Sequence, residues 1–148
     1  MKHSQTVEHI IAVSEDWDGG EELLAIYIPW VPTLLRQDKV IFHTDPGDSL
    51  QVATMVRPEG EIIVAHNHPT RERAIRETRE VLILREGKMI VSLYDRKRRL
   101  EREITMVDGD IIVLTGGYHS IKIVDTSELV EVKQGPYLGS KHDKSIMT

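Results

Sequence analysis

The chain has 148 residues, a length that suits one domain with a substantial core. Its 40% hydrophobic and 29% charged residues are typical of a soluble globular protein. The formal net charge of −5 argues against nucleic acid as the main partner, because phosphate binding favours a basic surface. No segment has the apolar length of a membrane span, and no apolar signal-type stretch follows Met1. We therefore expect a cytoplasmic protein with no membrane partner.

Short apolar runs separated by turn residues predict an all-β fold. Residues 6–13 favour a short helix or an arm, and 15–22 an acidic loop. The predicted strands cover residues 23–28, 39–43, 49–57, 61–68, 80–85, 88–94, 100–107, 111–114, 119–124 and 128–132. Asp45-Pro46-Gly47-Asp48 predicts one turn, and Glu86-Gly87 predicts a hairpin turn. Nine or ten short strands at this spacing indicate a sandwich or a barrel.

Three parts are expected along the chain. Residues 1–38 form an N-terminal extension, residues 39–134 the barrel, and residues 135–148 a polar tail. The apolar run from Leu23 to Pro32 either packs on its own barrel or is exchanged between two barrels. An open barrel leaves sheet edges that invite pairing, so we expect a homodimer.

His66 and His68 predict a metal site. Residues two apart on a strand point to the same face, so the two imidazoles lie side by side on the predicted strand 61–68. Pro69 then ends regular pairing, and Glu80 opens a later strand. The chain has no cysteine, which excludes disulfides and thiolate zinc sites and leaves imidazole and carboxylate as the strong ligands.

Gly60, His66, His68, Glu80 and Gly87 resemble the first motif of the cupin superfamily, Gly-x5-His-x-His-x(3–4)-Glu-x6-Gly. The stretch from Gly109 to His119 is similar to the second motif of that family. The resemblance covers residues 40–134. It implies a double-stranded β-helix, or jelly-roll, barrel with one metal ion held by four residues: His66, His68, Glu80 and His119. Cupins similar to this chain are commonly dimers.

The sequence departs from the family pattern at the carboxylate. Eleven residues separate His68 from Glu80, whereas Glu72 has the family spacing from the histidines. We choose Glu80, because sheet register fixes its height and face, and Glu72 and Arg76 would form an ordinary i,i+4 surface pair. The second motif is one residue short and has Thr115 where proline is common, so the turn that precedes His119 differs from that of the family.

A metal held by three imidazoles and one carboxylate has open positions if it prefers six ligands, and Mn, Fe, Ni or Zn would suit these donors. Such an ion can polarise a carbonyl or hydroxyl of a small molecule. The resemblance favours sugar or sugar-phosphate isomerisation or epimerisation. An Fe-dependent dioxygenase and a non-catalytic binding module remain as alternatives. Four polar residues are candidates for holding the small molecule: His43, Gln51, Arg57 and Tyr118. No catalytic residue is assigned.

Overall fold

The computed structural model describes residues 6–14, 18–33, 36 and 40–147. The chain divides into two compact units. Met1–Trp30 and Arg79–Thr148 form the first, here called the sheet unit, and Val31–Thr78 form the second, here called the insert unit. The insert unit therefore interrupts the sequence of the sheet unit.

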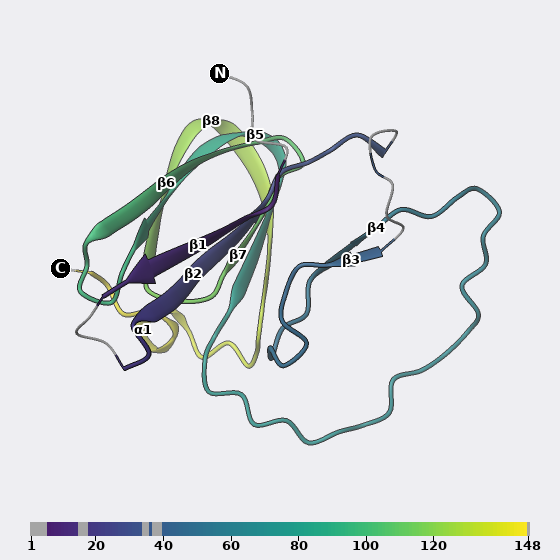
Figure 1. Ribbon diagram of the computed structural model, residues 1–148, viewed down its shortest axis with the longest axis horizontal. Coiled ribbons are helices and arrows are strands. Elements are labelled where there is room, and N and C mark those ends of the chain that lie inside the picture. The colour runs from purple at the N-terminus through teal and green to yellow at the C-terminus, as the bar shows by residue number, and fades with distance from the viewer. Residues whose placement is uncertain (1–5, 15–17, 34–35, 37–39, 148) are drawn as a thin grey trace. The chain divides into compact units, whose positions relative to one another are not determined.

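The sheet unit is a curled antiparallel sheet that forms half a barrel (Figure 1). Its strands are β1 (Glu8–Val13), β2 (Glu21–Ile28), β5 (Glu80–Tyr94), β6 (Leu100–Val107), β7 (Ile111–Leu114) and β8 (Tyr118–Lys133). The order across the sheet is β1-β2-β7-β5-β6, and β8 pairs with β5. The predicted all-β class is confirmed.

The strand β5 has different neighbours in its two halves. Residues 80–83 lie between β7 and the C-terminal half of β8, whereas residues 88–94 lie between β6 and the N-terminal half of β8. The register of β5 with β8 shifts between Leu84 and Met89, as at a β-bulge. Bulges bend a strand and increase its twist, which is how one long strand contributes to two faces of a curled sheet.

Gly87 makes this bulge possible, and the predicted Glu86-Gly87 hairpin turn is wrong. Gly87 has a φ of +111°, a backbone conformation that side chains disfavour. Its N–H donates to Asp108 Oδ1 over 2.7 Å, and a Cβ at this position would overlap Ser127. The glycine therefore allows β8 to approach closely, and β5 continues through the bulge as one bent strand instead of turning back. The partner strand is also continuous across the bulge, so the separately predicted strands 119–124 and 128–132 are one strand, β8.

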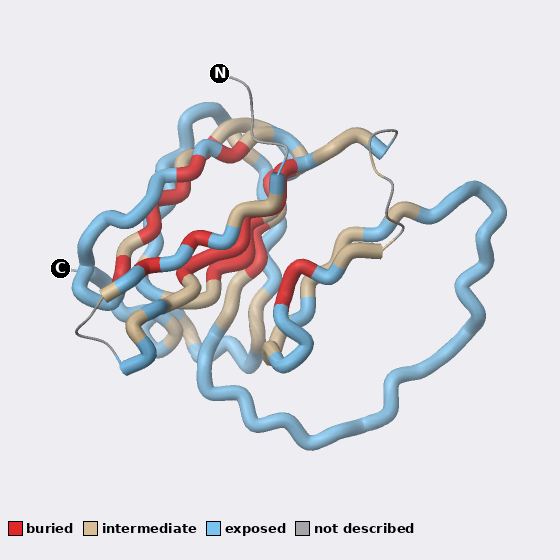
Figure 2. The backbone as a smooth tube through the Cα atoms, in the orientation of Figure 1, coloured by how far each residue is buried: buried red, intermediate tan, exposed pale blue. Residues whose placement is uncertain are grey.

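The core lies on the concave face of the sheet. Alternate residues of β5 point inward and are buried, namely Leu82, Leu84, Met89, Val91 and Leu93. Buried residues from β2, β6 and β7 pack with them. Figure 2 shows these buried stretches as red segments along the strands of the sheet unit. The buried residues of β5 thus follow the period-two alternation of a half-buried strand.

A buried carboxylate, Asp110, ties three parts of the sheet unit together. Asp110 is 1% exposed and accepts hydrogen bonds from the Tyr27 hydroxyl at 2.8 Å, from Trp30 N at 2.9 Å and from Val107 N at 3.0 Å. Burial, followed by the hydrogen bond to Asp110, raises the pKa of Tyr27. A buried charge needs partners of this kind, and here they fix the end of β2 to the β6–β7 turn.

The turn between β5 and β6 is anchored in the same way. Asp95, fully buried, accepts hydrogen bonds from Lys97 N and Arg99 N at 2.8 Å each and from Arg99 Nε at 2.7 Å. Burial alone would raise the pKa of Asp95, but the hydrogen bonds and the charge of Arg99 outweigh it and lower the pKa. The basic run at residues 96–99 is thus the hairpin turn between β5 and β6.

The insert unit contains one short hairpin, β3 (Val40–Phe42) with β4 (Ala53–Met55). The predicted turn at its centre is confirmed, since Asp45 Oδ1 accepts from Gly47 N at 2.8 Å. The predicted strand 61–68 is wrong, because residues 56–76 form no regular secondary structure and residues 57–78 are all exposed. Within the described part of the insert unit, β3 and β4 pair with each other, and residues 61–68 have no strand to pair with.

Two terminal segments also differ from expectation. Residues 8–13 form the strand β1 rather than a helix or an arm, because Ile10 and Ala12 are buried while Ile11 and Val13 are exposed, a period of two. The C-terminal segment contains one short helix, α1 (Ser140–Asp143). In the described part of the chain no helix combines the length and apolar character that crossing a bilayer would require.

Replacing Gly87 by alanine should destabilise the sheet unit by roughly 2–4 kcal/mol, because the new Cβ meets Ser127 and the Thr126 carbonyl in addition to the unfavourable φ. Gly19→Ala is the matched control. Gly19 also has a positive φ, +88°, but nothing lies within 4 Å of a Cβ there, so about 1 kcal/mol is expected. Urea unfolding of both variants measures the difference, and equal losses would contradict the proposed role of close approach.

Candidate metal centre

The structure brings together two of the four residues that the motifs predict as ligands. Glu80 begins β5 and His119 lies near the start of β8, 39 positions later in the sequence. His119 Nε2 lies 3.3 Å from Glu80 Oε2. In the antiparallel β5–β8 ladder His119 lies opposite Leu93, at the far end of β5 from Glu80. The pairing alone would therefore keep the two residues apart, and it is the curl of the sheet that brings their side chains together.

The carboxylate of Glu80 lies in a cluster of charged side chains. Lys133, directly opposite Glu80 in the β5–β8 ladder, has its Nζ 3.8 Å from Glu80 Oε1. The same ammonium lies 3.6 Å from Glu131 Oε1 and 3.4 Å from Asp143 Oδ2 of α1. The helix α1 therefore contributes to the surroundings of Glu80 through Lys133.

These neighbours set the ionisation of the cluster. A hydrogen bond with His119 is the largest influence and lowers the pKa of Glu80 to about 2, and the charges of His119 and Lys133 act in the same direction. Burial opposes them. For Lys133, burial would lower the pKa, but the hydrogen bond to Asp143 and the nearby carboxylates outweigh it and raise the pKa. Glu80 is thus a carboxylate across the whole ordinary range of pH.

The other two predicted ligands lie in the insert unit. His66 and His68 have ring centroids 5.3 Å apart, with the planes inclined at 73°. His66 Nδ1 lies 2.8 Å from the Val64 carbonyl. Since a carbonyl only accepts, Nδ1 carries the proton, and Nε2 of a neutral His66 keeps its lone pair for a ligand. Glu72, the alternative carboxylate, is an exposed residue of the same irregular segment.

The four predicted ligands therefore occur as two pairs, one in each unit. Among residues 6–14, 18–33, 36 and 40–147, no group of three or more histidine, aspartate or glutamate side chains is arranged to hold a metal ion. The assignment of a metal to His66, His68, Glu80 and His119 stays a prediction.

The four candidates for substrate binding are also divided. His43 is buried, with Nε2 2.9 Å from Thr54 Oγ1. Gln51 Nε2 donates to the Asp45 and Asp48 carbonyls, so this side chain closes the β3–β4 turn. These contacts give His43 and Gln51 structural roles within the insert unit.

Arg57 is exposed and Tyr118 is half-buried. Arg57 Nη1 forms an i,i+4 ion pair with Glu61 at 2.9 Å. Tyr118 is in the sheet unit, and the Arg98 guanidinium lies 6.0 Å from its ring centroid. Three of the four candidates thus belong to the insert unit and Tyr118 to the sheet unit.

Lys133 and Asp143 are neighbours of Glu80 that the sequence analysis missed. Strand alternation contains a signal for Lys133, since Leu129, Glu131 and Lys133 are spaced by two and share a face. That signal becomes useful only when the register of β8 against β5 is known. Asp143 lies in the predicted polar tail, where composition gives no sign of a contact.

The chain was compared with protein-family models, with curated proteins and with solved structures, and none of them matches it.

Because the pKa of Glu80 falls from 4.5 in a free side chain to about 2, ionised Glu80 stabilises the fold above pH 4.5. That contribution is lost as the pH falls from 4.5 through 2. Glu80→Gln should therefore cost roughly 1–3 kcal/mol at pH 6, and less than half as much at pH 3. Urea unfolding at both pH values measures this. Glu72→Gln, at an exposed position, is the control, and a Glu80→Gln penalty independent of pH would contradict the assignment.

Proposed function

We propose that this protein binds one divalent transition metal ion through His66, His68, Glu80 and His119 and acts on a small molecule at that ion. The observation that carries the proposal is the 3.3 Å approach of His119 Nε2 to Glu80 Oε2. These two residues were selected from two separate sequence motifs, and chance gives little reason for them to meet. Their contact supports the part of the motif assignment that lies within the sheet unit.

The chemistry of the donors fits such an ion. Imidazole nitrogen and carboxylate oxygen suit Mn, Fe, Ni and Zn in their divalent states. The low pKa of Glu80 keeps it ionised, and ligands must bind in their deprotonated form. The Val64 carbonyl at His66 Nδ1 provides the outer hydrogen bond that usually fixes the ring of a metal-binding histidine.

We also propose that the fold is a cupin-type jelly roll. The supporting feature is the double membership of β5, whose two halves have β7 and β6 respectively as neighbours across the bulge at Gly87. Strands that pass from one sheet to another through a bulge are how two-sheet β folds turn their corners. The motif resemblance supports the same fold.

For the reaction, we propose sugar or sugar-phosphate isomerisation or epimerisation, which rests on the resemblance to cupins. A bound ion would supply a Lewis acid for a carbonyl or hydroxyl group. The residues of the chain would hold the ion through Glu80 and His119, and Lys133 would balance the charge of Glu80. The cluster around Glu80 is only partly exposed, which limits competition from water.

Purified protein should contain close to one equivalent of a transition metal by elemental analysis, and the double variant His66→Ala/His68→Ala should lose at least nine-tenths of it. The matched control is His9→Ala/His142→Ala, which also removes two histidines, both exposed. Full metal content in the His66/His68 variant would reject the metal assignment.

The same measurement decides between the two carboxylates. Glu80→Gln should lower the metal content several-fold, because Glu80 contacts His119, whereas Glu72→Gln should leave it within about twofold of the wild type. A larger loss in Glu72→Gln would show that Glu72 is the ligand.

Metal-loaded protein should interconvert an aldose phosphate and its ketose or epimer, followed by ¹³C NMR, and the activity should disappear in His66→Ala/His68→Ala. Oxygen consumption with Fe²⁺ and no isomerisation would replace the isomerase proposal by an oxygenase. Sugar binding without turnover would leave a binding module.

A further inference from the structure

Lys133 connects the C-terminal segment, residues 134–147, to the carboxylate of Glu80. Its ammonium lies 3.4 Å from Asp143 Oδ2 and 5.1 Å from the centroid of the Tyr137 ring, and both residues belong to that segment. The same ammonium lies 3.8 Å from Glu80 Oε1 and 3.6 Å from Glu131 Oε1 on the strands. One cation is therefore shared between the C-terminal segment and the sheet.

The shared ammonium is held closer to the C-terminal segment than to Glu80. The 3.8 Å between Lys133 Nζ and Glu80 Oε1 exceeds the roughly 2.7–3.2 Å of a hydrogen bond, so this contact is an ion pair without one. Asp143 is the nearest of the three carboxylates, and the face of an aromatic ring within about 6 Å also attracts a cation. The side chains of Lys133, Glu80 and Asp143 are only 16–18% exposed, and salt screens such charges less than those at an open surface.

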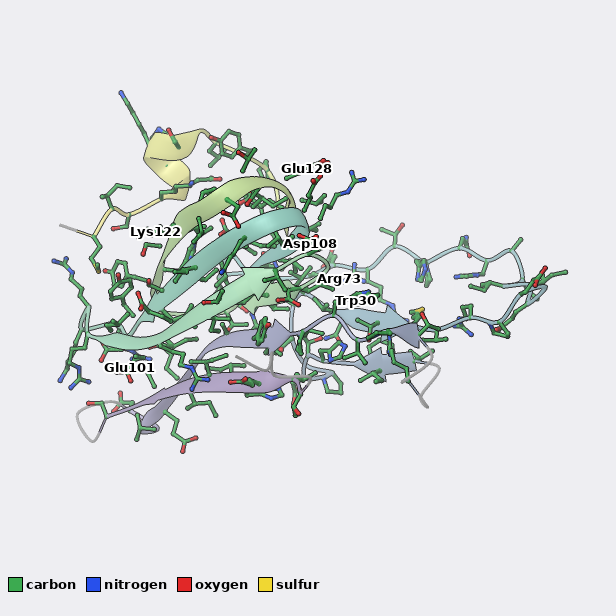
Figure 3. The ribbon with its side chains drawn as sticks, turned by 90° about the horizontal axis from the view of Figure 1, so that it is seen from above. Trp30, Arg73, Glu101, Asp108, Lys122 and Glu128 are labelled. Atoms are coloured by element: carbon green, nitrogen blue, oxygen red, sulfur yellow. The ribbon has the colours of Figure 1, made fainter. Side chains whose placement is uncertain are left out.

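The C-terminal segment has little packing of its own to hold it in place. The helix α1 buries none of its four residues. The large apolar side chains of the segment are also exposed, with Tyr137 at 64%, Leu138 at 66% and Ile146 at 73%. Figure 3 shows α1, in yellow, at the surface of the sheet unit. Segments with few buried contacts open at a low free-energy cost, so the contacts of Lys133 matter for the docking of this one.

We propose that the C-terminal segment controls the Glu80–His119 pair through Lys133, an inference that rests on the proposed cation site at that pair. While the segment is docked, Asp143 and Tyr137 hold the ammonium away from Glu80, and Glu80 Oε1 stays open to a cation. When the segment leaves, Lys133 loses both of these partners and its ammonium closes on Glu80. Asp143 is thus a positioning residue, and Lys133 is a cation that competes for the carboxylate.

The chemistry of lysine suits this exchange. Lysine carries a compact charge on a flexible four-carbon stem, so its ammonium can move between carboxylates while its backbone stays in the strand. Two cations at one carboxylate repel each other, so an ion at Glu80 disfavours the approach of Lys133. By reciprocity, an ion at Glu80 would push the ammonium toward Asp143 and strengthen the docking of the segment. Ion binding and docking are therefore linked.

Urea unfolding of a double-mutant cycle tests the link without any metal. The loss of stability caused by Glu80→Gln should be roughly twice as large in an Asp143→Asn background as in the wild type, because the ammonium then depends more on Glu80. In a Lys133→Met background the two changes should simply add. Lys133→Gln replaces Lys133→Met if circular dichroism shows that the sheet is lost. Additive changes with Lys133 present would overturn the proposal.

The second measurement is the Kd for Zn²⁺, by isothermal titration calorimetry of the full chain. Asp143→Asn should raise this Kd roughly fivefold, whereas Asp143→Glu, which keeps the charge, should stay within about twofold of the wild type. Lys133→Met should lower the Kd, and Asp143→Asn added to it should then change the Kd by less than about twofold. Asp125→Asn is the matched control, because it also removes a carboxylate from the sheet unit, at an exposed position roughly 26 Å from Lys133 along β8.

The two measurements distinguish failure of the metal site from failure of the link. A wild type that binds no Zn²⁺ but retains the coupling in urea would reject the metal site and support the link between the C-terminal segment and Glu80. Zn²⁺ binding that is equally tight in Asp143→Asn and in the wild type would overturn the control by the segment and leave the metal site in place.

Discussion

The antiparallel pairing of β5 with β8 is the contact on which the sheet unit depends. Thirteen residues of β5 are matched to β8, and β5 also carries β6 and β7. The pairing follows a bent path only because Gly87 accepts a positive φ and leaves room for Ser127. Without the bulge, the paired 15- and 16-residue strands would form a twisted ribbon that does not curl round a concave face. The bend is what creates a concave face and a core.

The same bend explains the chemistry near Glu80. His119 pairs with the far end of β5 in the ladder and yet reaches Glu80, and Lys133 lies across from Glu80 in the register. Ion pairs that hold an ionised carboxylate in a partly buried place are a feature of functional sites as well as of structural networks. The metal proposal interprets the cluster as part of a functional site. Whether the cluster is functional or structural, the stability of the fold in acid depends on it.

The sequence predicts those features that local rules control. The strands 100–107 and 111–114 match β6 and β7, since each is a short run bounded by turn residues, and the turn at Asp45 follows from its own side-chain hydrogen bond. Gly87 was misread because a bulge and a hairpin turn both need a residue that tolerates positive φ, and only the partner strand distinguishes them. The strand expected at residues 61–68 has the right alternation, but alternation supplies no pairing partner. Glu80 and His119 were identified from the spacing of residues in two motifs. The contacts of Lys133 and Asp143 depend on the register of β8 against β5 and on the position of the C-terminal segment, and motif spacing predicts neither.

The chain leaves the sheet after Trp30 and returns to it at Arg79, and both points are fastened by backbone donors. Trp30 N donates to Asp110, and Arg79 N donates to Gln134 Oε1 at 2.7 Å. Neither anchor uses a side chain from the 48 residues in between. Evolution could therefore lengthen, shorten or exchange that intervening stretch while the strand registers stay in place. In such a scaffold the sheet can keep its structure while the inserted stretch, and any binding specificity that it carries, changes.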